Sequence, residues 1–301
     1  MTSPLRLSDE VATALPAARP VVALESTLFV HGLPRPVNLE VAAEIERIVR
    51  EEGAVPATIG VVAGEGVIGL SRDEIERLST QSDIPKLGVR DLAPALALRR
   101  DGATTVASTS VLAHHAGIAV FATGGLGGVH RDAVDTFDES ADLTTLARTP
   151  ITIVSAGVKS ILDVAATLER LESLSITILG WQTGRFPGFY LRDAGFPLDW
   201  TVEEETQVAA VMAARSRLDL PGAILVANPV EEELDQAQHD RVLAEALAAA
   251  QREDVRGKAI TPFLLDQFHR ATDGASLRVN TEIIYRNARL GARIARAWSE
   301  R

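Results

Sequence analysis

Short apolar runs of strand length alternate with longer runs in which apolar residues recur every three or four positions. The first pattern predicts buried strands, and the second predicts amphipathic helices that cover a sheet. We therefore expect strands at 21–25, 58–63, 67–70, 118–122, 151–155, 176–181 and 223–227. Helices are expected at 36–51, 91–100, 108–116, 160–171 and 202–217, and over most of the chain after residue 241 apart from breaks near Gly257 and Gly274. This alternation predicts an α/β fold with a largely buried sheet.

Local signals support some of these boundaries. Pro36 stands at the start of one predicted helix and Gly53 just after its end, as is typical of helix termini. Ser71 followed by Glu74 predicts a capping box at the start of a further helix. Because no repeat, low-complexity tract or composition shift marks a linker, we expect an extension over residues 1–20 and a single domain over 21–301.

Composition narrows the class of partner. The net charge is −11 at pH 7, the opposite of the basic surface that nucleic-acid polymers require. The absence of cysteine excludes disulfides, thiolate metal sites and a cysteine nucleophile. Residues 1–20 do not resemble a secretory signal, and no apolar run approaches the roughly 20 residues of a membrane span. We expect a cytoplasmic protein whose ligands are small molecules, with no membrane or nucleic-acid partner.

Lysine is rare in this chain. Of the 30 Lys and Arg residues, three are lysines, namely Lys86, Lys159 and Lys258. Arginine stays protonated and cannot form an imine, whereas a desolvated lysine amine can. Each lysine is therefore a candidate for chemistry that arginine cannot perform, with an ordinary surface residue as the alternative.

A glycine-rich segment, FATGGLGGVHR at 121–131, follows a predicted buried strand. Four glycines in five positions let the backbone approach a ligand, which predicts a loop whose N–H groups bind a sugar phosphate. His130 and Arg131 would add charge there. The spacing fits neither a Walker A loop nor a dinucleotide fingerprint, and a plain tight turn remains the alternative.

Three carboxylates lie close together in TFDESAD at 136–142. Asp138 and Asp142 would share a face if the segment is helical, and such oxygens suit Mg²⁺ or Mn²⁺. An acidic first helical turn, capped by Asp138 or Ser140, explains the same spacing and is favoured on spacing alone.

Two further segments place a titratable group at the end of an apolar strand. Lys159 follows the strand at 151–155 where a helix is expected to begin, and the positive helix end would favour its neutral, nucleophilic amine. A helical pair with Asp163 is the alternative. Glu25 ends the strand at 21–25, where burial would suit a general acid. Lys86 could bind a phosphate or, equally, a surface carboxylate. Asn228 and Asn280 could hydrogen-bond a base, but an ordinary cap or turn role is favoured for each.

With these segments in hand, the chain resembles the pseudouridine-5'-phosphate glycosidase family, which includes indigoidine-synthase-A-like proteins. The similar motifs occur in order over more than nine-tenths of the chain. They are ALEST at 23–27, HGLPRPVN at 31–38, GAVPATI at 53–59, RDL at 90–92, GATTVAST at 102–109, FATGGLGGVHR, TFDESADL at 136–143, SAGVKSILD at 155–163, WQT at 181–183, VANP at 226–229 and GKAITPFLL at 257–265.

The resemblance implies a three-layer α/β/α fold with a mixed sheet, a homotrimer, and reversible cleavage of the C–C bond between uracil and ribose 5-phosphate. It implies that Lys159 is the nucleophile, forming an imine with C1' of the opened sugar, and that Glu25 is the proton donor. Asp138 would bind Mn²⁺, or Mg²⁺ or another divalent cation, largely through water. The implied substrate contacts are Lys86, Val106, Ser140, Ala141 and Asp142, together with His130 and Asn280.

One departure concerns the segment after Lys86. Members of the family can have Val-Ser-Arg-Arg where this chain has Leu87-Gly88-Val89-Arg90, which puts the contacts between Lys86 and Arg90 in doubt. Two other functions stay open on the residues alone. One is a different Schiff-base lyase acting on a sugar phosphate, and the other is a sugar-phosphate sensor without catalysis.

Overall fold

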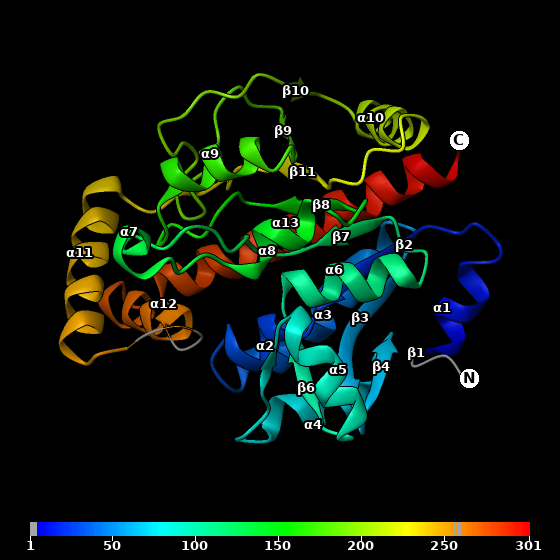
Figure 1. Ribbon diagram of the computed structural model, residues 1–301, viewed down its shortest axis with the longest axis horizontal. Helices are drawn as coiled ribbons and strands as arrows, with labels where there is room; N and C mark the ends of the chain where they lie inside the picture. Colours follow the sequence, from blue (N-terminus) through cyan, green and yellow to red (C-terminus); the bar gives the residue numbers. More distant parts are fainter. Residues whose placement is uncertain (1–4, 256, 258–259) are drawn as a thin grey trace.

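The computed structural model describes residues 5–255, 257 and 260–301 (Figure 1). The lysine candidate Lys258 lies outside these residues. Among the residues described, no helix combines the length and the apolar character needed to span a bilayer.

The strands of the described chain join in one mixed sheet, in the order β1-β4-β3-β2-β7-β8-β11-β9-β10, with β6 also paired to β3 and β5 to β6. All pairs are parallel except β3–β4 and β3–β6. The strands are β1 (Leu5–Leu7), β2 (Val21–Glu25), β3 (Val55–Val62), β4 (Glu65–Ile68), β5 (Lys86–Leu87), β6 (Gly102–Thr104), β7 (Val120–Ala122), β8 (Thr152–Ser155), β9 (Thr177–Trp181), β10 (Thr201–Val202) and β11 (Ile224–Ala227).

Helices cover both faces of this sheet (Figure 1). They are α1 (Asp9–Ala14), α2 (Thr27–His31), α3 (Val37–Glu51), α4 (Arg72–Thr80), α5 (Val89–Ala97), α6 (Val106–His115), α7 (Ala133–Thr136), α8 (Ala141–Leu146), α9 (Val164–Ser173), α10 (Glu205–Arg217), α11 (Gln236–Arg252), α12 (Ile260–Ala271) and α13 (Ala275–Ser299).

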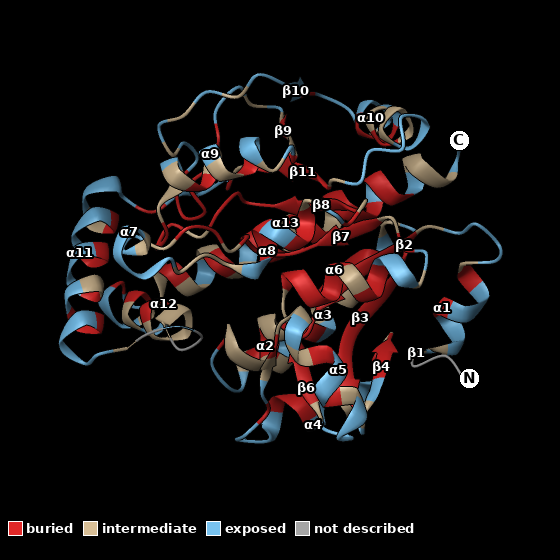
Figure 2. Ribbon diagram, in the orientation of Figure 1, coloured by how far each residue is buried: buried red, intermediate tan, exposed pale blue. Residues whose placement is uncertain are grey.

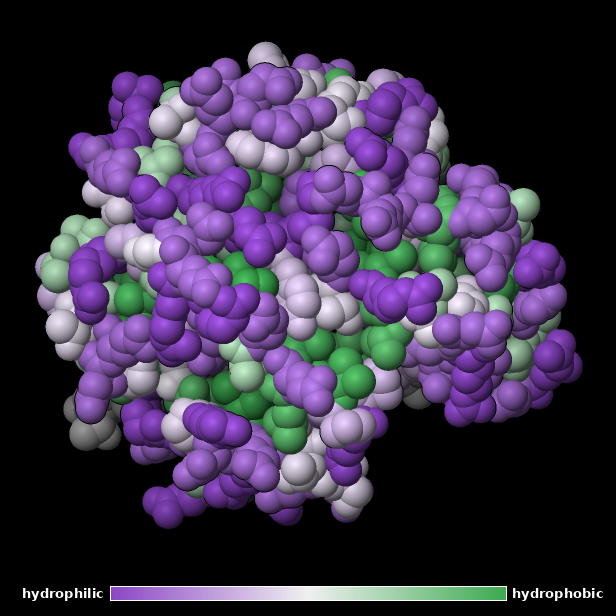
Figure 3. Space-filling model, turned by 180° about the vertical axis from the view of Figure 1, so that it is seen from behind, coloured by the Kyte–Doolittle hydropathy of each residue, from purple (hydrophilic) through white to green (hydrophobic). Residues whose placement is uncertain are grey.

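Alternation along β2 shows how the layers form. Val22 and Leu24 pack with α3 and α13 on one face, while Ala23 belongs to the apolar cluster that includes residues of α6, α8 and α9. Successive strand residues point to opposite faces, so one fully buried strand contributes to both layers. Figure 2 shows the central strands buried between the helices. Seen from behind, the surface is largely hydrophilic, with apolar residues gathered in hollows (Figure 3). The predicted α/β/α fold with a mixed sheet is confirmed.

Most predicted elements are present, but several bounds are wrong in strands as well as in helices; the strand predicted at 58–63, for example, lies at Val55–Val62. The strand at 21–25 has the predicted bounds, and both bonds of the Ser71–Glu74 capping box form, at 3.3 and 2.9 Å. The predicted helix at 160–171 is wrong at its start, because Asp163 caps a helix that begins at Val164. The predicted starts at Asp91 and Ser108 are also wrong, since α5 and α6 each begin two residues earlier. In the predicted extension, β1 pairs with β4 at the edge of the sheet.

The topology brings four strand ends to one edge. β2, β7, β8 and β11 are adjacent and parallel, so their carboxyl ends lie side by side. In open α/β sheets, ligands bind outside this edge. The segments that follow these strands carry Thr27, Thr123, Lys159 and Asn228.

Candidate active site

Glu25 is the last residue of β2, and its carboxyl lies in a buried setting. The Thr123 hydroxyl, from the segment after β7, donates a hydrogen bond to Glu25 Oε1. Burial raises the pKa of Glu25, and the charge of Lys159 opposes this shift. A buried carboxyl that resists ionisation suits a proton donor near neutral pH.

The backbone on both sides of Lys159 is fixed against the glycine-rich segment. The Lys159 N–H donates to the Leu126 carbonyl at 3.1 Å, and the Leu126 N–H donates to the Gly157 carbonyl at 2.9 Å. Gly157 has a φ of +82°, and a Cβ there would lie 2.3 Å from the Pro187 carbonyl oxygen. The turn between β8 and Lys159 therefore requires glycine.

The predicted place of Lys159 at the start of a helix is wrong. Lys159 lies in a loop before α9, whose N-cap is Asp163. The alternative pairing with Asp163 is also wrong, because that carboxylate accepts the Ala166 N–H at 2.9 Å. No ion pair joins Lys159 to another residue in the described part of the chain.

The glycine-rich segment differs from the predicted phosphate loop. The N–H groups of Leu126, Gly127 and Val129 donate to protein oxygens. A Cβ on Gly127 would lie 2.2 Å from Ser140 Oγ, and one on Gly128 would lie 2.4 Å from Thr167 Oγ1. These two glycines therefore serve close packing, and the prediction of N–H groups free for a ligand was wrong at Leu126, Gly127 and Val129, and also at His130, whose N–H donates to the Asp138 carbonyl at 3.0 Å.

Asp142 joins three elements. Its Oδ1 accepts the Ala107 N–H of α6 at 2.9 Å, and its Oδ2 accepts the Gly127 N–H at 2.8 Å. Ser140 caps α8 by accepting the Asp142 N–H at 3.2 Å, as the capping alternative predicted. A buried carboxylate that accepts two backbone N–H bonds is held in place, so Asp142 organises the wall of the site.

The remaining carboxylates of this segment differ in their availability for a metal. Glu139 pairs with Arg170 at 3.0 Å, which leaves the partly buried Asp138 facing the cleft. The described residues contain no group of three or more His, Cys, Asp or Glu that could hold an ion. A single carboxylate fits Mg²⁺ or Mn²⁺ in the mode where water and substrate phosphate complete the shell.

The N-termini of α5 and α6 line a cleft of about 550 Å³. Backbone N–H groups and the positive helix end favour an anion at such positions. Lys86 and His130 also line this cleft, as do Arg90 and Arg148. We call it the outer cleft, and its volume falls within the range of small-molecule sites.

A smaller cavity of about 50 Å³, the inner pocket, adjoins the outer cleft. Glu25, Lys86, Lys159, Thr27 and Thr261 line both cavities, so the two meet at these side chains. The structure thus gathers every residue singled out by the resemblance. The outer cleft also has Val106, Asp138, Ser140, Ala141, Asp142 and His130, and the inner pocket has Asn280.

The inner pocket is mainly apolar. Phe189 and Leu265 line it together with the buried Asn280 of α13. His31 Nε2 lies 2.9 Å from the Ile84 carbonyl oxygen, and burial lowers the pKa of His31, so the ring is neutral at neutral pH. Apolar walls with a few fixed polar groups are typical of pockets for small molecules.

Reasoning from the residues missed several lining side chains. Thr27 and Thr261 lie within the motifs ALEST and GKAITPFLL, which were a usable signal, whereas Phe189 had none. Asn228 lines neither cavity, because its amide donates to Asn287 Oδ1 at 2.9 Å. The predicted position of Asn228 beside a ligand is therefore wrong for these two cavities.

Comparisons with known proteins show which family this chain is similar to. A family model described as indigoidine synthase A like protein matches residues 10–297. A pseudouridine-5'-phosphate glycosidase of Salinispora tropica is 63% identical, over 99% of this chain and 93% of the relative. One from Caldanaerobacter subterraneus subsp. tengcongensis is 49% identical, over 96% and 95%.

Solved structures share the fold. The prealnumycin C-glycosynthase AlnA, in complex with ribulose 5-phosphate, superposes with a TM-score of 0.92 at 39% identity, covering 100% of this chain and 98% of that one. An indigoidine synthase A-like protein from Thermotoga maritima gives a TM-score of 0.89 at 34% identity, covering 98% and 96%.

Proposed function

The chain belongs to the indigoidine synthase A like protein family, and from this membership we propose the reaction that it performs. It is an enzyme that reversibly cleaves the C–C glycosidic bond of pseudouridine 5'-phosphate, giving uracil and ribose 5-phosphate. Relatives at 49% to 63% identity carry this activity in their names, and they match nearly the whole chain.

The observation that best supports a mechanism is the meeting of Glu25 and Lys159 where the inner pocket joins the outer cleft. A C-glycoside has no leaving heteroatom to protonate, so the two-carboxylate route of O-glycosidases does not serve. An amine nucleophile beside a buried acid provides another route, through an iminium ion.

In the proposed route the ribose ring opens before the C–C bond breaks. Glu25 protonates O4' as the C1'–O4' bond breaks, and the Lys159 nitrogen forms a bond to C1' with loss of a proton. The nitrogen lone pair then forms C1'=N as the C1'–C5 bond breaks, and uracil C5 takes up a proton. Water hydrolyses the iminium ion, which releases ribose 5-phosphate and restores the lysine.

The two cavities suit the two halves of this substrate. We place the phosphate in the outer cleft, beside Lys86 and the N-terminus of α6 at Val106, and uracil in the inner pocket beside Asn280. A divalent cation held by Asp138, when bound, would neutralise phosphate charge. Ser140, Ala141 and His130 contribute contacts from the wall of the outer cleft.

Release of uracil from pseudouridine 5'-phosphate, followed by chromatography, tests the reaction. Borohydride reduction during turnover, followed by peptide mass mapping, tests the iminium ion at Lys159. A reduced adduct with uracil release supports the proposal. An adduct formed from ribose 5-phosphate without uracil release would indicate a different Schiff-base lyase, and no turnover or adduct would indicate a sensor.

Homotrimeric assembly and a cytoplasmic location complete the proposal; the assembly rests on the family resemblance, and the location rests on the composition of the chain. Light scattering of the purified protein would test the assembly. A mass other than three times the 32.1 kDa chain would exclude the trimer.

A further inference from the structure

A chain of buried polar side chains lies directly behind Glu25. The Asn228 amide donates to Asn287 Oδ1 at 2.9 Å, and the Asn287 amide donates to the carbonyls of Thr123 and Gly124 at 2.7 and 3.3 Å. The Thr123 hydroxyl then donates to Glu25. This row of side chains joins the carboxyl ends of β11, β7 and β2 to the middle of α13.

These groups are costly to bury and do not line the cleft. Thr123, Asn228 and Asn287 are each at least 96% buried, and neither cavity includes them. Asn228 Oδ1 has no hydrogen-bond partner among the described residues. Buried amides without complete partners reduce stability, so their presence here calls for a role other than stability.

We propose that Thr123, held by Asn287 and Asn228, is a positioning residue that directs the carboxyl of Glu25 toward the substrate. This inference rests on the proposed function, because it assumes that Glu25 acts as the acid. Within the described residues, Thr123 provides the one side-chain hydrogen bond to Glu25, at Oε1. Oε2 is then the oxygen left to carry a proton into the cleft.

The Thr123 backbone is fixed on both sides. Its N–H donates to the Val154 carbonyl of β8 at 3.0 Å, and its carbonyl accepts from Asn287. With the backbone fixed, one rotation about χ1 decides where the hydroxyl points. A carboxyl with one oxygen tied in this way has few orientations left, which is the preorganisation that proton transfer requires.

The charged and titratable groups around Glu25 are Lys159 after β8, Lys86 in β5, Asp142 in α8 and the neutral His31 in α2. The two lysines and the Thr123 hydroxyl favour the ionised carboxyl, while burial and Asp142 favour the protonated one. Removing the hydroxyl leaves the other groups in place. The pKa of Glu25 should then rise, moving the alkaline decline of kcat/KM to higher pH.

The test compares three isolated substitutions. Thr123→Val removes the hydroxyl at nearly constant volume, and we expect kcat to fall about tenfold, a part of the 10² to 10⁴ that an acid contributes, with KM within about twofold. Thr123→Ser should restore most of kcat. Thr152→Val is the matched control, because Thr152 is a fully buried threonine of β8 whose hydroxyl has no partner in the described structure. A Thr123→Val enzyme with the wild-type kcat and pH profile would overturn the proposal.

A double-mutant cycle tests the role of Asn287. If Asn287 acts through Thr123, Asn287→Leu lowers kcat, and the double variant with Thr123→Val is no slower than Thr123→Val alone. If the two substitutions instead reduce kcat by factors that multiply in the double variant, Asn287 does not act through Thr123.

A measurement without substrate separates this inference from the proposed function. In protein labelled with ¹³C at the glutamate carboxyls, the signal lost in Glu25→Gln identifies Glu25, and its titration should move to higher pH in Thr123→Val. An unmoved titration would exclude the hydrogen bond as an influence on Glu25. A wild-type enzyme that releases no uracil would instead refute the function.

Discussion

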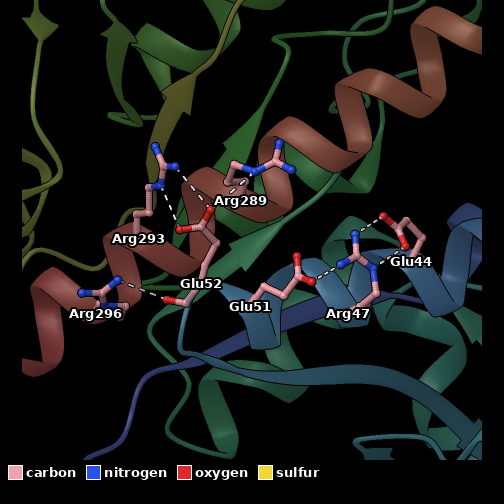
Figure 4. Close-up of polar contacts among 7 residues, drawn as sticks. All are labelled: Glu44, Arg47, Glu51, Glu52, Arg289, Arg293 and Arg296. Carbon is pink, nitrogen blue, oxygen red and sulfur yellow. Dashed lines mark hydrogen bonds and ion pairs between the residues drawn. The ribbon is translucent and has the colours of Figure 1, made fainter.

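The helix α13 presents two kinds of polar surface along its length. Toward its N-terminal half, Asn280 and Asn287 are 5% and 1% exposed and lie at the inner pocket and behind Glu25. Toward its C-terminus, arginines gather around the carboxylate and carbonyl of Glu52, which follows α3 (Figure 4). Arg293 bonds to that carboxylate at 3.0 Å and Arg289 at 3.4 Å, with side chains 48% and 41% exposed.

The two regions differ in how much each polar contact contributes, because one is exposed to water and the other is buried. At the exposed end, water competes with each ion pair, so the contacts contribute little and any one can be lost. At the buried end, the Asn287 side chain bonds to Asn228 and to the carbonyls of Thr123 and Gly124, and its loss would leave buried groups unsatisfied. We therefore expect substitutions at the buried end to change catalysis, and those at the exposed end to change stability slightly and catalysis hardly at all.

The largest effect should follow Lys159→Arg. Arginine keeps the positive charge but cannot form the C1'=N bond, so uracil release should fall at least about 10⁴-fold. Lys86→Arg is the control, since a cation near phosphate remains, and its kcat should stay within about tenfold. Rapid uracil release by the Lys159→Arg enzyme would contradict the covalent route.

Glu25→Gln should lower kcat by about 10² to 10⁴, the usual contribution of a general acid. Because burial raises the pKa of Glu25, wild-type kcat/KM should decline as the pH rises through that pKa, and this decline should be absent in the variant. Pre-steady-state and steady-state rates between pH 5 and 10 would show the difference. An unchanged rate would remove Glu25 from its role.

The same substitution should raise stability. As the pH rises above the ordinary glutamate pKa of about 4.3, the unfolded carboxyl ionises before the native one. Wild-type stability is therefore lost as the pH rises through the raised pKa of Glu25. Denaturation with urea should give Glu25→Gln a higher free energy of unfolding than the wild type at pH values above the raised pKa of Glu25. At pH 4 the two free energies should be equal. A gain confined to low pH would contradict this sign.

Asp138→Asn should have a smaller effect. If Asp138 holds a divalent cation, the variant should lose activity about tenfold and respond less to EDTA and to added Mn²⁺ than the wild type does. Glu139→Gln is the matched control, because the neighbouring carboxylate pairs with Arg170. Equal sensitivity to EDTA in wild type and Asp138→Asn would exclude Asp138 as the ligand.

The sequence predicted the sheet better than the site. Apolar runs such as 21–25 are decided by burial, which periodicity records directly. The position of Lys159 before α9 was missed, because the Asp163 cap sets the start of that helix and the spacing of apolar residues does not reveal a cap. The early start of α6 could have been found from Thr105, whose hydroxyl caps that helix.

Other features depend on residues far apart in the chain. Asn287 bonds to Thr123 across 164 positions, and Asp142 bonds to Ala107 across 35, so neither contact leaves a pattern in a single sequence. The glycines at 127 and 128 were expected to bind a ligand but make room for Ser140 and Thr167. The family motifs include these positions, but a motif does not show whether ligand binding or close packing requires the residue.

The smallest effect belongs to Glu52→Gln. The Glu52 carboxylate forms ion pairs with Arg289 and Arg293 of α13. Because those guanidinium groups stay solvated when the charge is removed, we expect the free energy of unfolding to fall by about 1 kcal/mol or less. Because exposed ion pairs are screened by salt, the loss should shrink further in 1 M NaCl. Thermal unfolding at low and high salt measures the loss of stability. Uracil release measures kcat, which we expect to be nearly unchanged. A tenfold change in kcat would show that the exposed end of α13 transmits its position to Asn280 and Asn287, and the contrast between the two ends would no longer hold.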